Sequence, residues 1–242
     1  MKKITFAIIT GLLILTAASC RKDHWIRGEG PSVTNIRSVS GFNAVSLSID
    51  ANVEIIRDSA FRIELHGQQN ILNVVTTSVS GSTLDIDLKR HTNIRRHSPI
   101  TVRVFMPELV SMDISGSGDM SCDNRFSCET LNMNISGSGN ISFQGDVSNS
   151  VKANISGSGS ITLGGAGTCR NARYIISGSG NINAEWMKAE YVDANISGSG
   201  DMRIYATTQL DARISGSGDI AYRGTPAISV NISGSGKLRQ IQ

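Results

Sequence analysis

One pentapeptide, Ile-Ser-Gly-Ser-Gly, recurs seven times and limits what this chain can fold into. The starts of successive copies are 21, 20, 21, 20, 18 and 18 residues apart. A repeat of about 20 residues is typical of a solenoid, in which each repeat forms one coil that buries its apolar face only against its neighbours. The copies begin at Ile114, Ile135, Ile155, Ile176, Ile196, Ile214 and Ile232.

The residues on either side of the pentapeptide predict β-strands. Before a copy, apolar and polar residues alternate, as in Leu131-Asn-Met-Asn-Ile135, and after it a polar residue precedes an apolar one, as in Asn140-Ile141. This period of two indicates strands with one buried face, and no helical period of 3.6 is present in the repeats. Each coil is therefore expected to hold a strand, a tight turn, a second strand and a return of variable length.

The two glycines of each copy are expected at the tight turn. Either a positive φ or a close approach of two backbones would require glycine there, because both conditions oppose a Cβ atom. The sequence thus predicts an all-β fold, a single-stranded β-helix or β-solenoid with seven coils. The turn glycines are Gly116, Gly118, Gly137, Gly139, Gly157, Gly159, Gly178, Gly180, Gly198, Gly200, Gly216, Gly218, Gly234 and Gly236.

Stacked coils lie about 4.8 Å apart, so equivalent residues form columns along the solenoid axis. The residue before each pentapeptide forms a polar column, and stacked Asn amides can hydrogen-bond along such a column. Its members are Asp113, Asn134, Asn154, Ile175, Asn195, Arg213 and Asn231.

The N-terminus indicates export. Lys2 and Lys3 precede an apolar run that is too short to span a membrane, and small residues follow it up to Cys20. Residues 1–19 are interpreted as a lipoprotein-type signal peptide, with lipidation of Cys20 and ordinary signal cleavage as the alternative. A lipidated cysteine would anchor the protein to a membrane, and the expected location is the cell envelope, as an outer-membrane lipoprotein facing the surface or the periplasm.

Residues 20–31 are expected to form a short tether. Residues 32–112 have strand-like alternation but no pentapeptide, and they are expected to form a β-rich cap. The sequence does not decide between a separate β-sandwich and degenerate coils of the same solenoid; either would cover one end, as solenoids require. Residues 113–242 form the repeat region.

Three cysteines lie beyond Cys20. Cys122 and Cys128 share one expected return, and in an oxidising compartment they are candidates for a disulfide, although spacing alone does not fix the distance between them. Cys169 falls two coils from Cys128, beyond disulfide reach, and is expected to be a buried thiol. This set lacks the ligands of a zinc site, and no cofactor is predicted.

Charge and candidate chemistry point to binding without catalysis. The formal charge of +3 is too small to indicate a nucleic-acid partner. Asp201 and Asp219 follow their turns on adjacent coils, where two carboxylates could hold Ca²⁺ or share a proton. The favoured interpretation is that they form local turn hydrogen bonds. The dense basic run from Lys89 to His97 is interpreted as a solvated hairpin tip, with anionic lipid or polysaccharide as the alternative partner.

The pattern is similar to a family of bacterial secreted proteins described as putative auto-transporter adhesin, head GIN domain. Besides the serial Gly-Ser-Gly turns, the resemblance includes Ile26-Arg-Gly-Glu-Gly30, Arg37-Ser-Val-Ser-Gly-Phe42, Val53-Glu-Ile55 and Leu84-Asp-Ile86. It implies a right-handed β-helix similar in shape to pectin lyases, no recognised catalytic set and an adhesive role.

The expected function is non-enzymatic adhesion to a glycan or an extracellular protein. The alternatives are a structural or self-assembling envelope protein, which would form homo-oligomers, and a carbohydrate-active enzyme.

Overall fold

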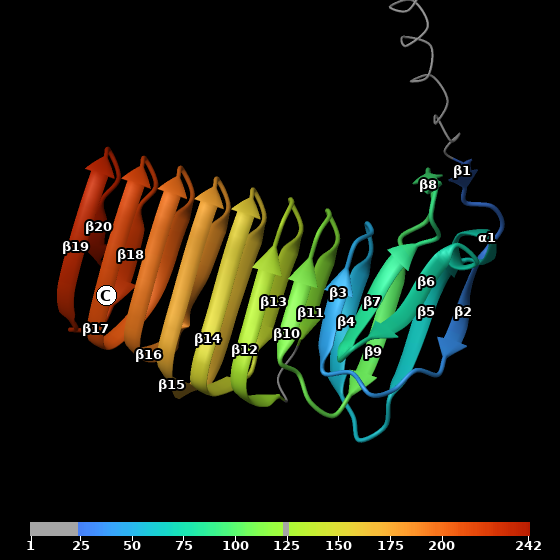
Figure 1. The fold of residues 1–242 in the computed structure, drawn as a ribbon, viewed down its shortest axis with the longest axis horizontal. Coiled ribbons are helices and arrows are strands. Elements are labelled where there is room, and N and C mark those ends of the chain that lie inside the picture. The colour runs from blue at the N-terminus through green and yellow to red at the C-terminus, as the bar shows by residue number, and fades with distance from the viewer. Residues whose placement is uncertain (1–23, 123–125) are drawn as a thin grey trace, which may run out of the picture.

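The computed structural model describes residues 24–122 and 126–242. The expected signal peptide, residues 1–19, and the expected lipidation site at Cys20 lie outside the described residues. The described chain forms an elongated β-solenoid whose coils stack side by side along the long axis of the molecule (Figure 1). Within the described residues, no helix is long and apolar enough to cross a membrane.

The solenoid has about six turns, not the seven coils expected from seven pentapeptides. In each coil, one arm enters the glycine corner and the next arm leaves it. The arms that enter the corners lie in β10 (Ser111–Ile114), β12 (Ser127–Ile135), β14 (Asp146–Gly157), β15 (Ser160–Gly178), β16 (Asn181–Gly198), β17 (Asp201–Gly216) and β19 (Ala227–Gly234).

The arms that leave the corners form the opposite side of the coil. β15, β16 and β17 are long because each holds a leaving arm, a return and the next entering arm. All arms pair in parallel with the equivalent arm of the next coil, as in Ile176 opposite Ile196. The remaining leaving arms are β11 (Asp119–Cys122), β13 (Asn140–Gln144), β18 (Ile220–Arg223) and β20 (Leu238–Gln240).

The apolar residues of each coil stack in columns inside the solenoid, as the alternation predicts. The pentapeptide isoleucines from Ile114 to Ile214 are buried, because each is covered by a coil on both sides. Another column places the large ring of Tyr174 between Ala153 and Ala194, so small neighbours leave room for it. Stacking thus converts the repeat into one continuous hydrophobic core.

The corners need glycine for two reasons. From the third corner onward, the first glycine has a positive φ, from 145° at Gly157 to 130° at Gly234, a region that residues other than glycine rarely adopt. The second glycine packs against the coil below it. A Cβ atom on Gly180 would lie 2.5 Å from the carbonyl oxygen of Gly159.

The parallel columns continue into the region before the first pentapeptide. β3 (Ala44–Leu47) pairs in parallel with β10, and β4 (Asn52–Arg57) pairs in parallel with β11. Beyond them, β7 (Thr83–Leu88) pairs with β3 and β9 (Thr101–Met106) pairs with β4. Strands of residues 32–112 therefore belong to the same hydrogen-bonded sheet as the repeats.

Antiparallel strands cover this end of the solenoid. β5 (Arg62–Gln68) pairs with both β9 and β2 (Ser32–Arg37), and β6 (Val75–Ser80) pairs with β7. The short helix α1 (Gln69–Leu72) joins β5 to β6. The guanidinium of Arg37 donates to the carbonyl of Leu72 at 2.8 Å, and burial lowers its pKa. The cap closes the sheet edges that would otherwise be open.

A separate two-stranded ribbon stands apart from the main sheet at the capped end (Figure 1). β1 (His24–Arg27) pairs in parallel with β8 (Thr92–Arg95). Residues 24–27 were expected within a tether, but they form a strand because the segment at 92–95, distant in sequence, supplies its hydrogen-bonding partner.

Candidate functional site

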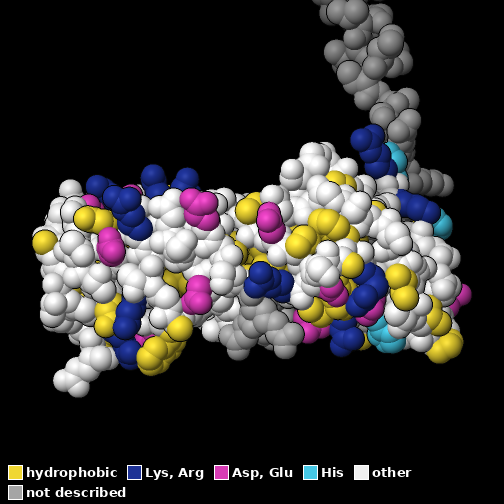
Figure 2. Space-filling view, turned by 90° about the horizontal axis from the view of Figure 1, so that it is seen from below, with side chains coloured by type: hydrophobic (Ala, Val, Ile, Leu, Met, Phe, Trp, Pro, Cys, Tyr) yellow, Lys and Arg dark blue, Asp and Glu magenta, His cyan; other side chains and the backbone are white. Residues whose placement is uncertain are grey.

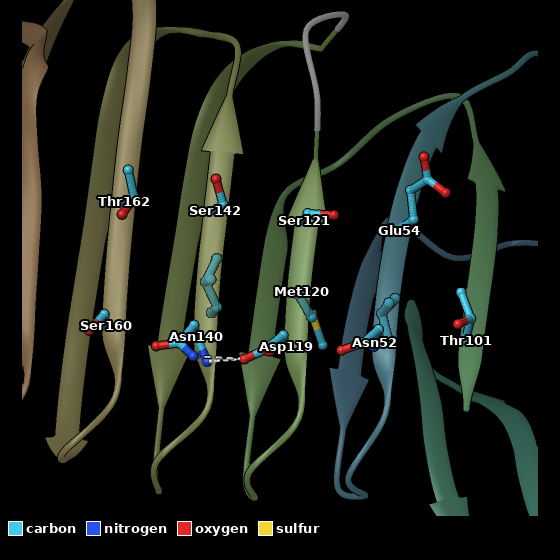
Figure 3. Close-up of a pocket in the computed structure, with 12 residues that line it drawn as sticks. Asn52, Glu54, Thr101, Asp119, Met120, Ser121, Asn140, Ser142, Ser160 and Thr162 are labelled. Atoms are coloured by element: carbon cyan, nitrogen blue, oxygen red, sulfur yellow. Dashed lines mark hydrogen bonds between the residues drawn. The ribbon is translucent and has the colours of Figure 1, made fainter. Parts of the chain in front are cut away.

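A groove runs along the outer side of the leaving arms (Figure 3). It has a volume of about 650 Å³ and crosses β9, β4, β11, β13 and the start of β15. This surface is called the exit face, and the cavity is called the exit-face groove. Its polar lining residues are Asn52, Glu54, Thr101, Asp119, Ser121, Asn140, Ser142, Ser160 and Thr162.

Strand alternation places these side chains on the outside. In β13, Ile141 and Phe143 are buried in the core, so Asn140 and Ser142 point outward. Register then aligns Ser142 with Ser121 on one side and with Thr162 on the other. Because these residues are small, they line a hollow. This second outward row lies two residues beyond the position that follows each corner, and the sequence alone did not mark it as a site.

The column that follows the corners is tied together by hydrogen bonds. Asp119 Oδ1 accepts from the backbone N–H of Asn140 at 3.0 Å and from its side-chain amide at 2.8 Å. Glu54, at the capped end of the groove, pairs with Arg103 at 3.0 Å. Within the described chain, the hydroxyls of Ser121, Ser142 and Thr162 have no side-chain or backbone hydrogen-bond partner. They are the groups that remain available to a ligand.

Asp201 and Asp219 lie in this same column, farther along the solenoid. Asp201 Oδ1 accepts the backbone N–H of Asp219, and Asp219 Oδ1 accepts the backbone N–H of Lys237, both at 2.8 Å. These bonds join adjacent coils across 18 residues of sequence, so they are contacts between coils and not local turn hydrogen bonds. Among the residues that the structure describes, no group of three His, Cys, Asp or Glu side chains is placed to hold a metal ion.

The exit-face groove is therefore equipped for hydrogen bonding. Hydroxyl and amide groups both donate and accept, so they can pair with the hydroxyls of a polar ligand. The groove lining contains no histidine, cysteine or lysine.

The outer side of the entering arms, called the entry face, contains the Asn column. The amide of Asn134 donates to Asp113 at 2.6 Å, and the amide of Asn154 donates to Asn134 at 2.8 Å. The column is interrupted at Ile175, whose side chain cannot continue the chain of amide bonds. The expected hydrogen bonding along stacked amides is thus present over the first three coils.

Charged residues and the ring of Tyr191 lie farther along the entry face. Asp193 is shared by Arg213 at 2.8 Å and Arg173 at 3.7 Å. Beside them, Tyr191 and Lys152 line a second cavity of about 270 Å³. Basic and acidic side chains are interspersed over the surface seen in Figure 2, so the repeat region offers no face of one charge there.

The returns carry exposed aromatic side chains. Trp186 is 59% exposed, and the guanidinium of Arg223 lies 4.4 Å from the centre of its ring. The amine of Lys188 lies 5.7 Å from the ring of Tyr205. Such contacts of a cation with an aromatic face contribute about 0.5–1 kcal/mol at exposed sites.

The three cysteines that the structure describes lie in the core. Cys122 and Cys128 are buried, and no bond joins these two described residues; the disulfide stays a prediction. Burial raises the pKa of the Cys128 thiol to about 11, an effect that the nearby charge of Arg57 opposes. Burial also raises the pKa of Cys169, whose sulfur donates to the carbonyl of Asn171 at 3.2 Å. These thiols are poor nucleophiles because the thiolate is the reactive form.

Comparison with known proteins places these features in context. The sequence profile of the family described as putative auto-transporter adhesin, head GIN domain, matches residues 41–226. No curated protein is similar enough to the chain to count as a match.

Several solved structures share the fold. A putative adhesin from Bacteroides fragilis is 26% identical with a TM-score of 0.84, over 89% of this chain and all of that one. A putative lipid binding protein from Parabacteroides distasonis is 24% identical with a TM-score of 0.76, over 90% of this chain and all of that one. A putative adhesin from Parabacteroides merdae is 22% identical with a TM-score of 0.69, with the same coverage.

Proposed function

The chain belongs to the family described as putative auto-transporter adhesin, head GIN domain, and on that premise we propose that it is a non-enzymatic binding protein of the cell envelope. Its ligand is a glycan or an extracellular protein, and the ligand lies in the exit-face groove. The observation that carries this proposal is the row of outward hydroxyls at Ser121, Ser142 and Thr162, which have no partner within the described chain.

The geometry of the groove supports an extended, polar ligand. Its hydroxyls recur at the spacing of the coils, about 4.8 Å, so a ligand lying along the axis meets the same groups several times. A rigid, preformed surface also lowers the entropy lost on binding. The core beneath the groove is continuous and supplies that rigidity.

Anchoring and location are part of the same proposal. Lipidation of Cys20 would hold the protein on the outer membrane without a spanning segment. The solenoid would then extend from the membrane as a long binding surface. Mass spectrometry of the protein purified from membranes tests the anchor, because a lipidated N-terminal peptide beginning at Cys20 is expected.

An array of glycans and matrix proteins tests the binding function. The chain from residue 21 to residue 242 contains every described strand, and we expect it to bind one class of ligand saturably. Ser142→Arg fills the groove and should abolish that binding. Asn195→Arg adds the same charge on the entry face and should not. A folded sample that binds nothing on the array would contradict the adhesive function.

A structural role is the second candidate, and one observation favours it. β19 is the entering arm of the last coil and, among the described strands, pairs only with β17, and its apolar residues Ile228, Val230 and Ile232 are 44%, 51% and 40% exposed. Exposed apolar strands at a sheet edge promote association with another chain. A second copy that stacks on β19 would bury these residues, and because the other end is capped, assembly would stop at a dimer.

A further inference from the structure

The ribbon of β1 and β8 gathers the basic residues of the N-terminal region on one small element. Arg27 lies on β1, Arg95 lies on β8, and Lys89, Arg90 and Arg96 flank β8; all five are exposed. Among the described residues, the carboxylates near these five cations are those of Glu29, Asp50 and Asp87, so positive charge is in excess there. In the described part of the chain, none of the five cations forms a salt bridge. The basic run is thus half of a paired ribbon, not a hairpin tip.

An exposed tryptophan lies among these charges. Trp25 is 51% exposed, and the guanidinium of Arg95 lies 3.9 Å from the centre of its ring. Tryptophan favours the boundary between water and lipid, because its ring is largely apolar while its N–H remains able to hydrogen-bond. Blue and cyan side chains, basic and histidine, are visible at the right-hand end of the molecule in Figure 2.

Hydrogen bonds fix the ribbon to the body. Buried Gln68 donates to the carbonyl of Gly30 at 3.0 Å and accepts the N–H of Ser98 at 3.0 Å, so it joins the segments that follow β1 and β8. The amide of Asn70 donates to the carbonyl of Arg27, and its oxygen accepts the N–H of Glu29. Whatever binds the ribbon therefore also sets the orientation of the solenoid.

The position of the ribbon in the sequence identifies the partner. β1 begins four residues after Cys20, and Arg21 and Lys22 lie between them. Four extended residues span about 14 Å at most, so a lipid on Cys20 would keep the ribbon near the bilayer surface. Clusters of Lys and Arg beside a membrane anchor are attracted to anionic headgroups.

We propose that the β1–β8 ribbon binds the anionic phospholipid surface of the membrane and thereby sets the direction in which the solenoid points. This inference uses the anchor of the proposed function to choose a bilayer as the partner. The binding itself requires only Trp25 and the five cations, so it can be measured without the lipid.

Vesicle co-sedimentation of residues 21–242 tests the proposal. We expect binding to vesicles that contain phosphatidylglycerol and weak binding to vesicles of phosphatidylcholine alone. Salt should release the protein, because it shortens the electrostatic screening length to about 10 Å at 0.1 M. Each cation contributes about fivefold to partitioning, so the double variant Arg95→Gln/Arg96→Gln should weaken partitioning about 25-fold. Arg203→Gln/Arg239→Gln removes the same charge at the far end and should leave partitioning nearly unchanged.

Tryptophan fluorescence gives a second readout. In a Trp186→Phe background, Trp25 is the only tryptophan, and its emission should shift to the blue on phosphatidylglycerol vesicles. Failure of the wild-type chain to bind these vesicles, or equal losses in the two double variants, would overturn the proposal. Neither result bears on glycan binding, which the array measures separately, or on lipidation of Cys20, which mass spectrometry measures.

Discussion

Replacing a corner glycine tests the physical basis of the repeat, because two copies of the corner differ in the space they offer. At Gly178, φ is 142°, and an added Cβ would overlap the carbonyl oxygen of Gly157 and lie 3.2 Å from its carbonyl carbon. At Gly116, φ lies outside the glycine-only region, and the nearest atom, the carbonyl oxygen of Ser48, would be 3.4 Å away. The two sites share sequence but not surroundings.

The expected costs follow from these geometries. Gly178→Ala incurs about 1–3 kcal/mol for a backbone conformation that alanine avoids. Displacing the neighbouring coil adds about 1–3 kcal/mol, the usual cost of overpacking. We therefore expect the free energy of unfolding to fall by about 2–5 kcal/mol. Gly116→Ala should change it by less than about 1 kcal/mol, because alanine restricts the unfolded chain and meets ordinary contacts in the folded one.

Urea unfolding, followed by circular dichroism, measures the difference between the two variants. Because solenoids can unfold in parts, the transition should also be followed by fluorescence, and non-coincident transitions indicate local opening near the replaced corner. If Gly178→Ala were as stable as Gly116→Ala, close stacking of the corners would not be the reason for the repeated glycines.

Further predictions concern the core, the amide column and the open end. Burial raises the pKa of the Cys128 thiol from 9.0 in the unfolded chain to about 11 in the fold. The stability that the protonated thiol contributes is therefore complete below pH 9 and is lost as pH rises to 11. The urea midpoint should fall over that range, and it should fall less in Cys128→Ala. Asn134→Ala removes one hydrogen bond to Asp113 and one from Asn154, and it should lower the free energy of unfolding by about 1–2 kcal/mol. An equal loss from Asn195→Ala, in the same column, would refute the role of those hydrogen bonds. If the solenoid end associates, sedimentation velocity should show a dimer at high concentration that Val230→Lys abolishes; a wild-type chain that stays monomeric contradicts the structural role.

Much of the repeat region could be predicted from the sequence because its information is local and repeated. The apolar alternation around Ile155 and Ile176 gives strands, and the fixed interval between the pentapeptides gives parallel stacking in register. The columns follow from the stacking alone.

The capped end could not be predicted in the same way. Pairing of β5 with β2 and β9 joins segments far apart in sequence, and no periodicity marks the partners. The same reason hid the pairing of β1 with β8, which turned part of an expected tether into a strand. Register between distant strands depends on the packing of the whole end and not on any one segment.

The candidate site was predicted in part. The position after each corner could be singled out at Asp201 and Asp219, but their hydrogen bonds reach the next coil and so depend on the stacking. The exit-face groove depends on Ser142 lying between Ser121 and Thr162. The signal for it was present as small hydroxyl residues at equivalent positions, two residues after the column.

The affinity of one array-identified ligand for matched variants tests the central claim most directly. Isothermal titration calorimetry would compare the wild-type chain, Ser142→Arg in the exit-face groove and Asn195→Arg on the entry face. We expect Ser142→Arg to lose binding at least tenfold, equivalent to about 1.4 kcal/mol, while Asn195→Arg binds as the wild type does. Equal affinity of Ser142→Arg and the wild type would show that the groove is not the binding surface.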